Sequence, residues 1–320
     1  MKKLLVAMLL IPTLAFAWEP TKPITAIVGY GPGSGNELSF RGVAAEIEKT
    51  HPKVNFLIKN VPGADGVIAA NELVNSKPDG YTIHISGNLS TYVTNEAFDQ
   101  HAIRYKFEDL YPILSIATSP QVIVARPNSK INTAKEFVKY IQKPDQPVNI
   151  AYGSNVQLLI YNLVMNKAGG DRNMVKQIGY KGPMQALMDV VGGHTEFGMM
   201  PLAVAAPQIN SGKVKLIAVT GDKRHPAYPD VPKIAEYLPG VEVMAMWNIT
   251  VPKDTPKEVV DWYVVTISNA IKSDNVKKYF ADNYMTAATD LNPTEAKKVI
   301  ENLRERYLPT ALVVKKQLDK

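Results

Sequence analysis

Apolar and polar positions follow two alternating periods along the first part of the chain. Short apolar runs bounded by glycine, proline or asparagine predict strands, and longer runs with apolar residues three and four positions apart predict helices. Strands are expected at residues 24–30, 54–59 and 81–86, with helices at about 37–49 and 67–75 between them. Because helices connect parallel strands, this order predicts a doubly wound parallel sheet.

A second α/β unit follows. Its expected strands lie near residues 122–125, 149–152 and 216–220, and its expected helices near 134–141, 158–167 and 183–191. Thr133 is placed to cap one helix, and Pro183 suits the first position of another. Two amphipathic helices at residues 257–272 and 293–316, with 274–284 between them, are expected to pack back on the first unit.

The chain makes the same turn twice. A predicted strand enters Gly33-Ser34-Gly35-Asn36 and then a helix, and the strand at 148–152 enters Gly153-Ser154-Asn155 and then another helix. Unpaired N–H groups and partial positive charge at a helix start can hold an anion. One such turn is ordinary in an α/β protein, but a pair on two lobes predicts a cleft that binds one anion.

The N-terminus has the features of a secretory signal. Lys2 and Lys3 precede an apolar run at residues 4–14 and the small-residue site Ala15-Phe16-Ala17. Cleavage is expected after Ala17, with the mature chain in the periplasm. The chain contains no cysteine, which excludes disulfides, thiolate metal sites and lipid-modified cysteine.

Size and charge limit the function classes. The 303 residues after the signal exceed one typical core, so two lobes are expected. Net charge is +6, or +4 without Lys2 and Lys3, and the positive residues are scattered. This distribution argues against nucleic acid as a partner.

Motifs for catalysis and cofactors fail on spacing. Gly29, Gly31, Gly33 and Gly35 recur every second residue and fit neither G-x-G-x-x-G nor a P-loop. Ser154 lacks the second glycine of a nucleophile elbow, and the five histidines form no pair at metal-ligand spacing. No catalytic residue, metal or cofactor is therefore predicted, although distant residues could still cluster into an enzyme site.

Several turn motifs, taken together, resemble the periplasmic solute-binding proteins of tripartite tricarboxylate transporters, the Bug proteins. They are Lys22-Pro23-Ile24 with the glycine loop, the 60–66 segment NVPGADG, the 78–82 segment PDGYT, the 149–154 segment NIAYGS, Tyr180-Lys181-Gly182, Val191-Gly192-Gly193, the 211–220 segment SGKVKLIAVT, Arg224, Pro229-Asp230-Val231-Pro232, Trp247 and Thr255-Pro256. The resemblance covers nearly the whole mature chain.

The resemblance implies an α/β fold of the two-lobed type II periplasmic binding-protein class, with a ligand cleft between the lobes. Residues 18–121 and 246–320 would form lobe 1, and 122–245 lobe 2. Backbone N–H groups of both loops would hold a carboxylate. The implied ligand-binding residues are Tyr30, Gly33, Ser34, Gly35, Asn36, Glu37, Ser86, Gly87, Asn88, Gly153, Ser154, Asn155, Gln157, Tyr180 and Met200.

Four places in the chain depart from the family pattern. The first loop has Gly33-Ser34 in place of two adjacent glycines and Glu37 in place of an aspartate, and the second loop reads Asn155-Val156-Gln157. Glu37 either satisfies the helix start, the interpretation favoured slightly, or selects ligands with a hydrogen-bond donor. Met200 stands near an expected aspartate, where it either fills core or softens the cleft wall.

The sequence therefore predicts a monomeric periplasmic receptor that delivers a small organic carboxylate to the integral membrane subunits of a transporter. The alternatives are a ligand-presenting sensor for a signalling receptor and, less favoured, a periplasmic enzyme. Dicarboxylates, citrate-like acids, aromatic acids and amino acids all remain candidate ligands. Glu37 argues against highly charged tricarboxylates, and Met200 favours a partly apolar acid.

Overall fold

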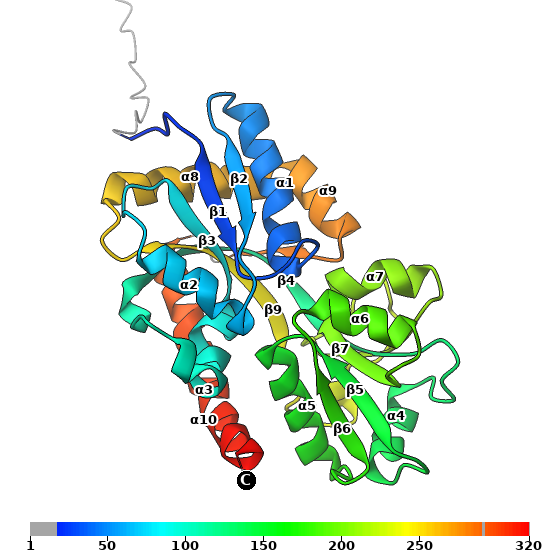
Figure 1. Cartoon of the computed structure of the whole chain (residues 1–320). Coiled ribbons are helices and arrows are strands. Elements are labelled where there is room, and N and C mark those ends of the chain that lie inside the picture. The colour runs from blue at the N-terminus through cyan, green and yellow to red at the C-terminus, as the bar shows by residue number, and fades with distance from the viewer. Residues whose placement is uncertain (1–17, 290–291, 320) are drawn as a thin grey trace, which may run out of the picture.

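The computed structural model describes residues 18–289 and 292–319, and the predicted signal segment lies outside these ranges. Two α/β lobes are joined by crossing strands (Figure 1). The strands are β1 (Ile24–Val28), β2 (Phe56–Asn60), β3 (Thr82–Gly87), β4 (Leu110–Ala125), β5 (Val148–Tyr152), β6 (Val175–Gly179), β7 (Phe197–Pro201), β8 (Lys215–Val219), β9 (Met244–Pro252) and β10 (Thr286–Ala287). The helices are α1 (Gly35–Thr50), α2 (Val67–Val74), α3 (Asn95–Phe98), α4 (Ala134–Gln142), α5 (Asn155–Ala168), α6 (Pro183–Val191), α7 (Leu202–Asn210), α8 (Lys257–Lys272), α9 (Asp274–Asp282) and α10 (Pro293–Leu318).

The first lobe is built on the predicted parallel unit. β1 pairs in parallel with β2 and β3, and β9 joins the other edge of β3 in the antiparallel direction. The core beneath this sheet contains Phe40 of α1, Ile85 of β3 and Tyr263 of α8, all fully buried. The mixed α/β class with two lobes is thus confirmed.

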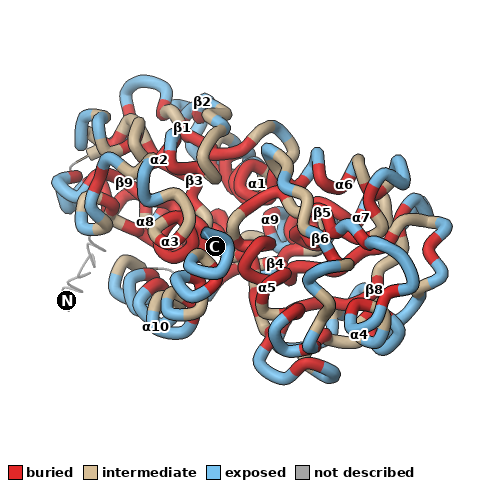
Figure 2. Tube along the Cα trace, turned by 60° about the horizontal axis from the view of Figure 1, so that its bottom comes forward, coloured by how far each residue is buried: buried red, intermediate tan, exposed pale blue. Residues whose placement is uncertain are grey.

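The second lobe repeats the pattern around β5, which pairs in parallel with β6 and β7. α4 and α5 pack on one apolar cluster and α6 and α7 on another (Figure 2). The central strand β7 is buried throughout, whereas the edge strand β6 is partly exposed. The predicted caps are confirmed, since Thr133 Oγ1 accepts the Glu136 N–H at 3.2 Å and Pro183 begins α6.

The sixteen-residue strand β4 runs through both lobes. Its first part pairs with β9 as far as Pro120, and from Gln121 onward it pairs with β7. The sequence indicated only the last four residues of this strand and missed β9 and β7. The exact lobe boundaries expected from the sequence stay a prediction.

The C-terminal helix differs from the sequence expectation. α8 and α9 pack on α1 of the first lobe, as expected. α10, in contrast, reaches both lobes, because Arg304 Nη1 donates to the Tyr92 carbonyl at 2.6 Å while Tyr307 and Ala311 lie in a core cluster of the second lobe. The Tyr307 hydroxyl also donates to the Glu242 carbonyl. α10 therefore spans the junction on the outside.

Candidate functional site

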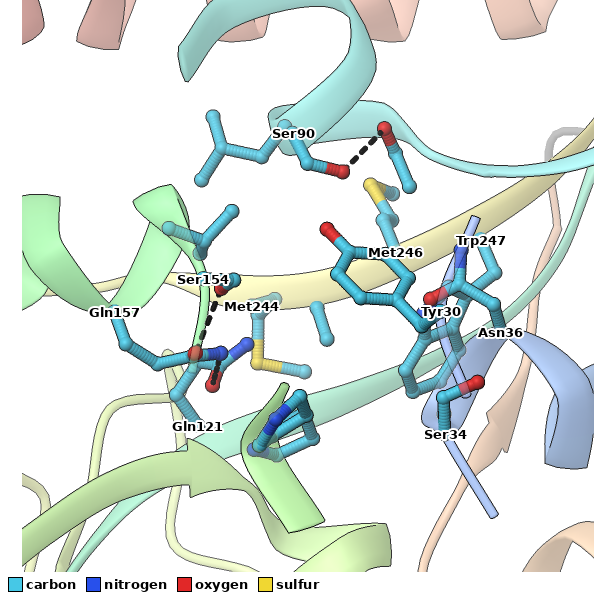
Figure 3. A pocket seen from close by; sticks show the side chains of 17 residues that line it. Tyr30, Ser34, Asn36, Ser90, Gln121, Ser154, Gln157, Met244, Met246 and Trp247 are labelled. Carbon is cyan, nitrogen blue, oxygen red and sulfur yellow. Dashed lines mark hydrogen bonds between the residues drawn. The ribbon is translucent and has the colours of Figure 1, made fainter. Parts of the chain in front are cut away.

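A narrow cavity lies where the two predicted turns face each other across the lobes. Ser34, the N-cap residue of α1, and Asn36 line one side of it, and Ser154, the N-cap residue of α5, and Gln157 line the other (Figure 3). The residues that line it are Tyr30, Ser34, Gly35, Asn36, Gly87, Leu89, Ser90, Gln121, Ser154, Val156, Gln157, Pro183, Pro201, Met244, Ala245, Met246 and Trp247.

The start of α1 forms one wall, and its cap is incomplete. Ser34 occupies the N-cap position, yet its Oγ makes no capping bond and has no hydrogen-bond partner among the described residues. Its side chain is nevertheless buried, with 4% of the residue exposed. A buried hydroxyl without a partner is costly, so this atom indicates a place for a polar ligand group.

Glu37 lies behind this wall and does not line the cavity. Its Oε2 accepts the Gly33 N–H at 3.1 Å and the Asn60 amide at 3.2 Å, while its Oε1 accepts from the Arg41 guanidinium. With 1% of its surface exposed, Glu37 is committed to the loop. These contacts match the interpretation that Glu37 satisfies the helix start.

Gly35 is required by a close approach of the first helical turn to β9. A Cβ atom on this residue would overlap the indole ring of Trp247, which is itself 3% exposed. Asn36 fixes the other side of the turn by donating from Nδ2 to the Ile85 carbonyl of β3 at 2.9 Å. The α1 start is therefore held rigidly against the strands.

The start of α5 forms the opposite wall through neutral groups. Gln157 Oε1 accepts from Ser154 Oγ at 2.6 Å and from the Gly153 N–H at 3.3 Å, and Gln157 Nε2 donates to Gln121 Oε1 at 3.1 Å. The amides of Gln157 and Gln121 are each 2% exposed. A Cβ on Gly153 would overlap the backbone of Gly182, which explains the glycine at this turn.

The floor of the cavity is apolar. Met244, Met246 and Trp247 come from β9 (Figure 3). Leu89 and Val156 add further apolar side chains to the lining. None of the cavity-lining residues within the described part of the chain carries a charge. The site therefore offers helix N–H groups, hydroxyls and amides to a ligand with an apolar part.

A second cavity adjoins the first and shares Tyr30 and Ser154 with it. Its lining contains Asp65, Asp99 and Lys181. Burial raises the pKa of Asp65 to about 7, an effect opposed by its hydrogen bonds from Tyr30 and Asn155. Burial followed by the nearby Asp65 charge raises the pKa of Tyr30 well above its usual value.

The structure brings together part of the predicted site. Seven predicted residues line the first cavity: Tyr30, Ser34, Gly35, Asn36, Gly87, Ser154 and Gln157. Three others line only the second cavity: Gly153, Asn155 and Tyr180. The remaining five, Gly33, Glu37, Ser86, Asn88 and Met200, line neither. Ligand contact by any of them stays a prediction.

For Met200 and Ser86, the structure shows why the side chain does not line a cavity. Met200 is fully buried in an apolar cluster of the second lobe, so it fills core. Ser86 bonds within the first-lobe sheet, where its hydroxyl lies 3.0 Å from Thr250 Oγ1.

Sequence reasoning missed the residues that come from the crossing strands, above all Gln121, Met244 and Met246. Trp247 belongs to the family pattern but not to the predicted site. The closely spaced Met244, Met246 and Trp247 were the available signal.

No group of three or more metal-binding side chains occurs among the described residues. In that same part of the chain, no helix is both long and apolar enough to cross a membrane.

Comparisons with known proteins agree with this architecture. A UPF0065 protein of Bordetella bronchiseptica is 30% identical over 243 residues, which is 76% of this chain and 71% of the relative. The periplasmic binding protein BugD superposes with a TM-score of 0.82 at 25% identity, covering 93% of this chain and 98% of BugD. MatC from Rhodopseudomonas palustris with bound malate superposes with a TM-score of 0.83 at 23% identity, covering 92% of this chain and 100% of MatC.

The profile of the family described as "Tripartite tricarboxylate transporter family receptor" matches residues 40–311, which include most of both lobes and the crossing strands. The chain belongs to the tripartite tricarboxylate transporter receptor family.

Proposed function

We propose that the protein is a periplasmic receptor that binds a small organic carboxylate between its lobes and presents it to the membrane subunits of a tripartite transporter. The observation that carries this proposal is the buried, unpartnered Ser34 Oγ at the start of α1, inside an interlobe cavity. A carboxylate there would accept from Ser34 and from the free N–H groups of the first helical turn.

Three further observations support the proposal. The family is one of transporter receptors, and malate is bound in MatC, which shares this fold. Lys2, Lys3 and the apolar run before Ala17 have the pattern of an export signal. The described residues that line the cavity are all uncharged, which suits the binding of one anion at a helix start.

Thermal unfolding of the mature protein tests this function. The protein is first refolded to strip bound solute and then mixed with mono-, di- and tricarboxylates, aromatic acids, amino acids and nucleotides. A ligand at 100 times its Kd adds about 2.7 kcal/mol to the free energy of unfolding, so the Tm of the protein rises by about 4 °C or more. Stabilisation by one class of carboxylate supports the receptor, and a response to nucleotides alone contradicts it.

A further inference from the structure

The starts of α1 and α5 differ because a carboxylate of the first lobe already lies on α5. The backbone N–H of Asn155, the first residue of α5, donates to Asp65 Oδ2 at 3.0 Å. The other carboxylate oxygen of Asp65 accepts from the Tyr30 hydroxyl at 2.8 Å. The chain's own carboxylate thus occupies a helix start that the sequence assigned to the ligand.

A second acid reinforces this difference in charge. The Asn155 side chain donates from Nδ2 to Asp99, so two carboxylates lie on the first residue of α5. Lys181 is the one cation among the described residues that line this cavity. Negative charge at a helix start offsets the partial positive charge that would attract an anion. α5 is therefore a poor site for a second anionic group.

At the α1 start, the carboxylate of the chain is that of Glu37, which accepts the N–H of Gly33 in the preceding loop and not that of the first helical residue. Ser34 Oγ is without a partner among the described residues, and Glu37 lies behind the loop, where Arg41 balances its charge. Between the two helix starts, the cavity presents the amides of Gln121 and Gln157 and the apolar surface of Met246 and its neighbours. These groups suit the uncharged remainder of an acid, not a second carboxylate.

We infer that the receptor selects acids with a single carboxylate, held at α1, and that Asp65 is the residue that rejects a second carboxylate at α5. This inference rests on the proposed function and names its substrate class. Asp65 lies in the adjoining cavity, but it accepts the N–H of Asn155, the residue after Ser154, which lines both cavities. A dicarboxylate that reached from Ser34 to Ser154 would therefore bring its second charge toward Asp65. Like charges so placed in a half-buried site disfavour binding by an order of magnitude or more.

The local backbone decides which substitution tests Asp65. Asp65 and Ala64 both have left-handed backbone conformations, with φ of +50° and +43°. Asparagine tolerates this conformation and keeps the side-chain shape, so Asp65→Asn removes the charge with little change in backbone preference. Asp261→Asn is the charge-matched control, because Asp261 lies on α8 with an exposed partner, Lys257, and lines neither cavity.

The experiment measures Kd by titration calorimetry for acid pairs that differ by one carboxylate, namely butyrate and succinate, hexanoate and adipate, and benzoate and terephthalate. It is run at about pH 8, where Asp65 is mostly ionised because its pKa is about 7. In the wild type and in the control variant Asp261→Asn, each monocarboxylate should bind at least about tenfold more tightly than its paired dicarboxylate. In Asp65→Asn, the ratio of the dicarboxylate Kd to the monocarboxylate Kd should fall by about tenfold, because the dicarboxylate binds more tightly.

Each other outcome has a distinct meaning. Tighter dicarboxylate binding in the wild type overturns the inferred substrate class but leaves the carboxylate receptor intact. An unchanged ratio in Asp65→Asn overturns the role of Asp65. If none of these acids and no acid of the wider panel binds, the proposed function itself fails, and the inference fails with it.

Discussion

Glu37 and Gln157 hold equivalent positions in two helices of different lobes. Each is the third residue after a serine N-cap, and each accepts a hydrogen bond from the glycine N–H before that serine, at 3.1 Å from Gly33 and 3.3 Å from Gly153. The first acceptor is a carboxylate turned away from the cavity, and the second is a neutral amide that lines it. The two turns therefore share geometry but differ in charge.

Gln157→Glu should weaken acid binding by about tenfold or more at about pH 8. The new carboxylate would keep the bonds from Gly153 and Ser154, but it would place negative charge in the cavity and lose the donor to Gln121. Titration calorimetry with the best-binding acid measures the change. Glu37→Gln is the reciprocal control, expected to lower stability by about 1–3 kcal/mol through lost bonds while affecting affinity less. Wild-type affinity in Gln157→Glu would contradict the placement of the anion.

Gly153→Ala should reduce both stability and ligand affinity. Its Cβ would overlap the backbone of Gly182, so the β5–α5 turn or the start of α6 must shift, at a cost of about 1–3 kcal/mol. Gly182→Ala is the matched control, because a Cβ at that residue meets no atom within 4 Å in the described structure. Urea unfolding and acid titration of both variants test the contact. Equal behaviour of the two variants would show that the close approach is unimportant.

Ligand binding should change the fluorescence of Trp247. Its indole ring lines the cavity, whereas Trp18 and Trp262 pack against each other in the first lobe, with ring centroids 5.3 Å apart. Trp247→Phe should therefore remove most of the ligand-dependent change, and Trp262→Phe should retain it. A full response in Trp247→Phe would mean that the ligand binds elsewhere.

The sequence predicted the elements with strong local signals and the turns between them. α6 and α8 agree with their expected bounds, because each has apolar residues at helical spacing and a proline at or before its start. β9 and most of β4 were missed because these strands are defined by partners far apart in the chain, such as Trp247 and Ala117. The local pattern of apolar and polar residues does not indicate which distant strands pair with each other.

Pairing between distant segments also explains why part of the site could not be predicted from the sequence. Glycine and serine spacing predicted both helix starts, which contribute Ser34 and Ser154 to the cavity. The wall from Gln121 and Met246 depends on where β4 and β9 cross, and the occupation of α5 by Asp65 depends on how the lobes meet. Asp65 had been noticed only as part of a turn motif.

The titration of Asp65 should lower stability as pH rises. Its pKa is raised to about 7 from an unfolded value near 4, so the native state binds this proton more tightly than the unfolded chain. The resulting stabilisation is fully present below about pH 4 and is lost as pH rises through about 7. As pH rises from about 4 to 7, the free energy of unfolding of Asp65→Asn should therefore increase relative to that of the wild type. Above about pH 8 the difference between the two should stay constant. Parallel stability curves from urea unfolding would contradict this.

The titration of His84 should lower the stability of the protein as pH falls. It is buried in β3, and burial lowers its pKa to about 4. Its contribution to stability is present above the unfolded pKa of about 6.5 and is lost as pH falls toward 4. As pH falls through this range, the free energy of unfolding of the wild type should consequently decrease relative to that of His84→Gln. A constant difference would show that His84 does not titrate there.

The most direct measurement is a crystal structure of the mature protein with its tightest-binding acid. We expect one ligand carboxylate within hydrogen-bond distance of Ser34 Oγ and the backbone N–H groups that begin α1, with the rest of the ligand against Met246 and Trp247. An acid bound outside the cavity between α1 and α5, or one that leaves Ser34 without a partner, would contradict the account.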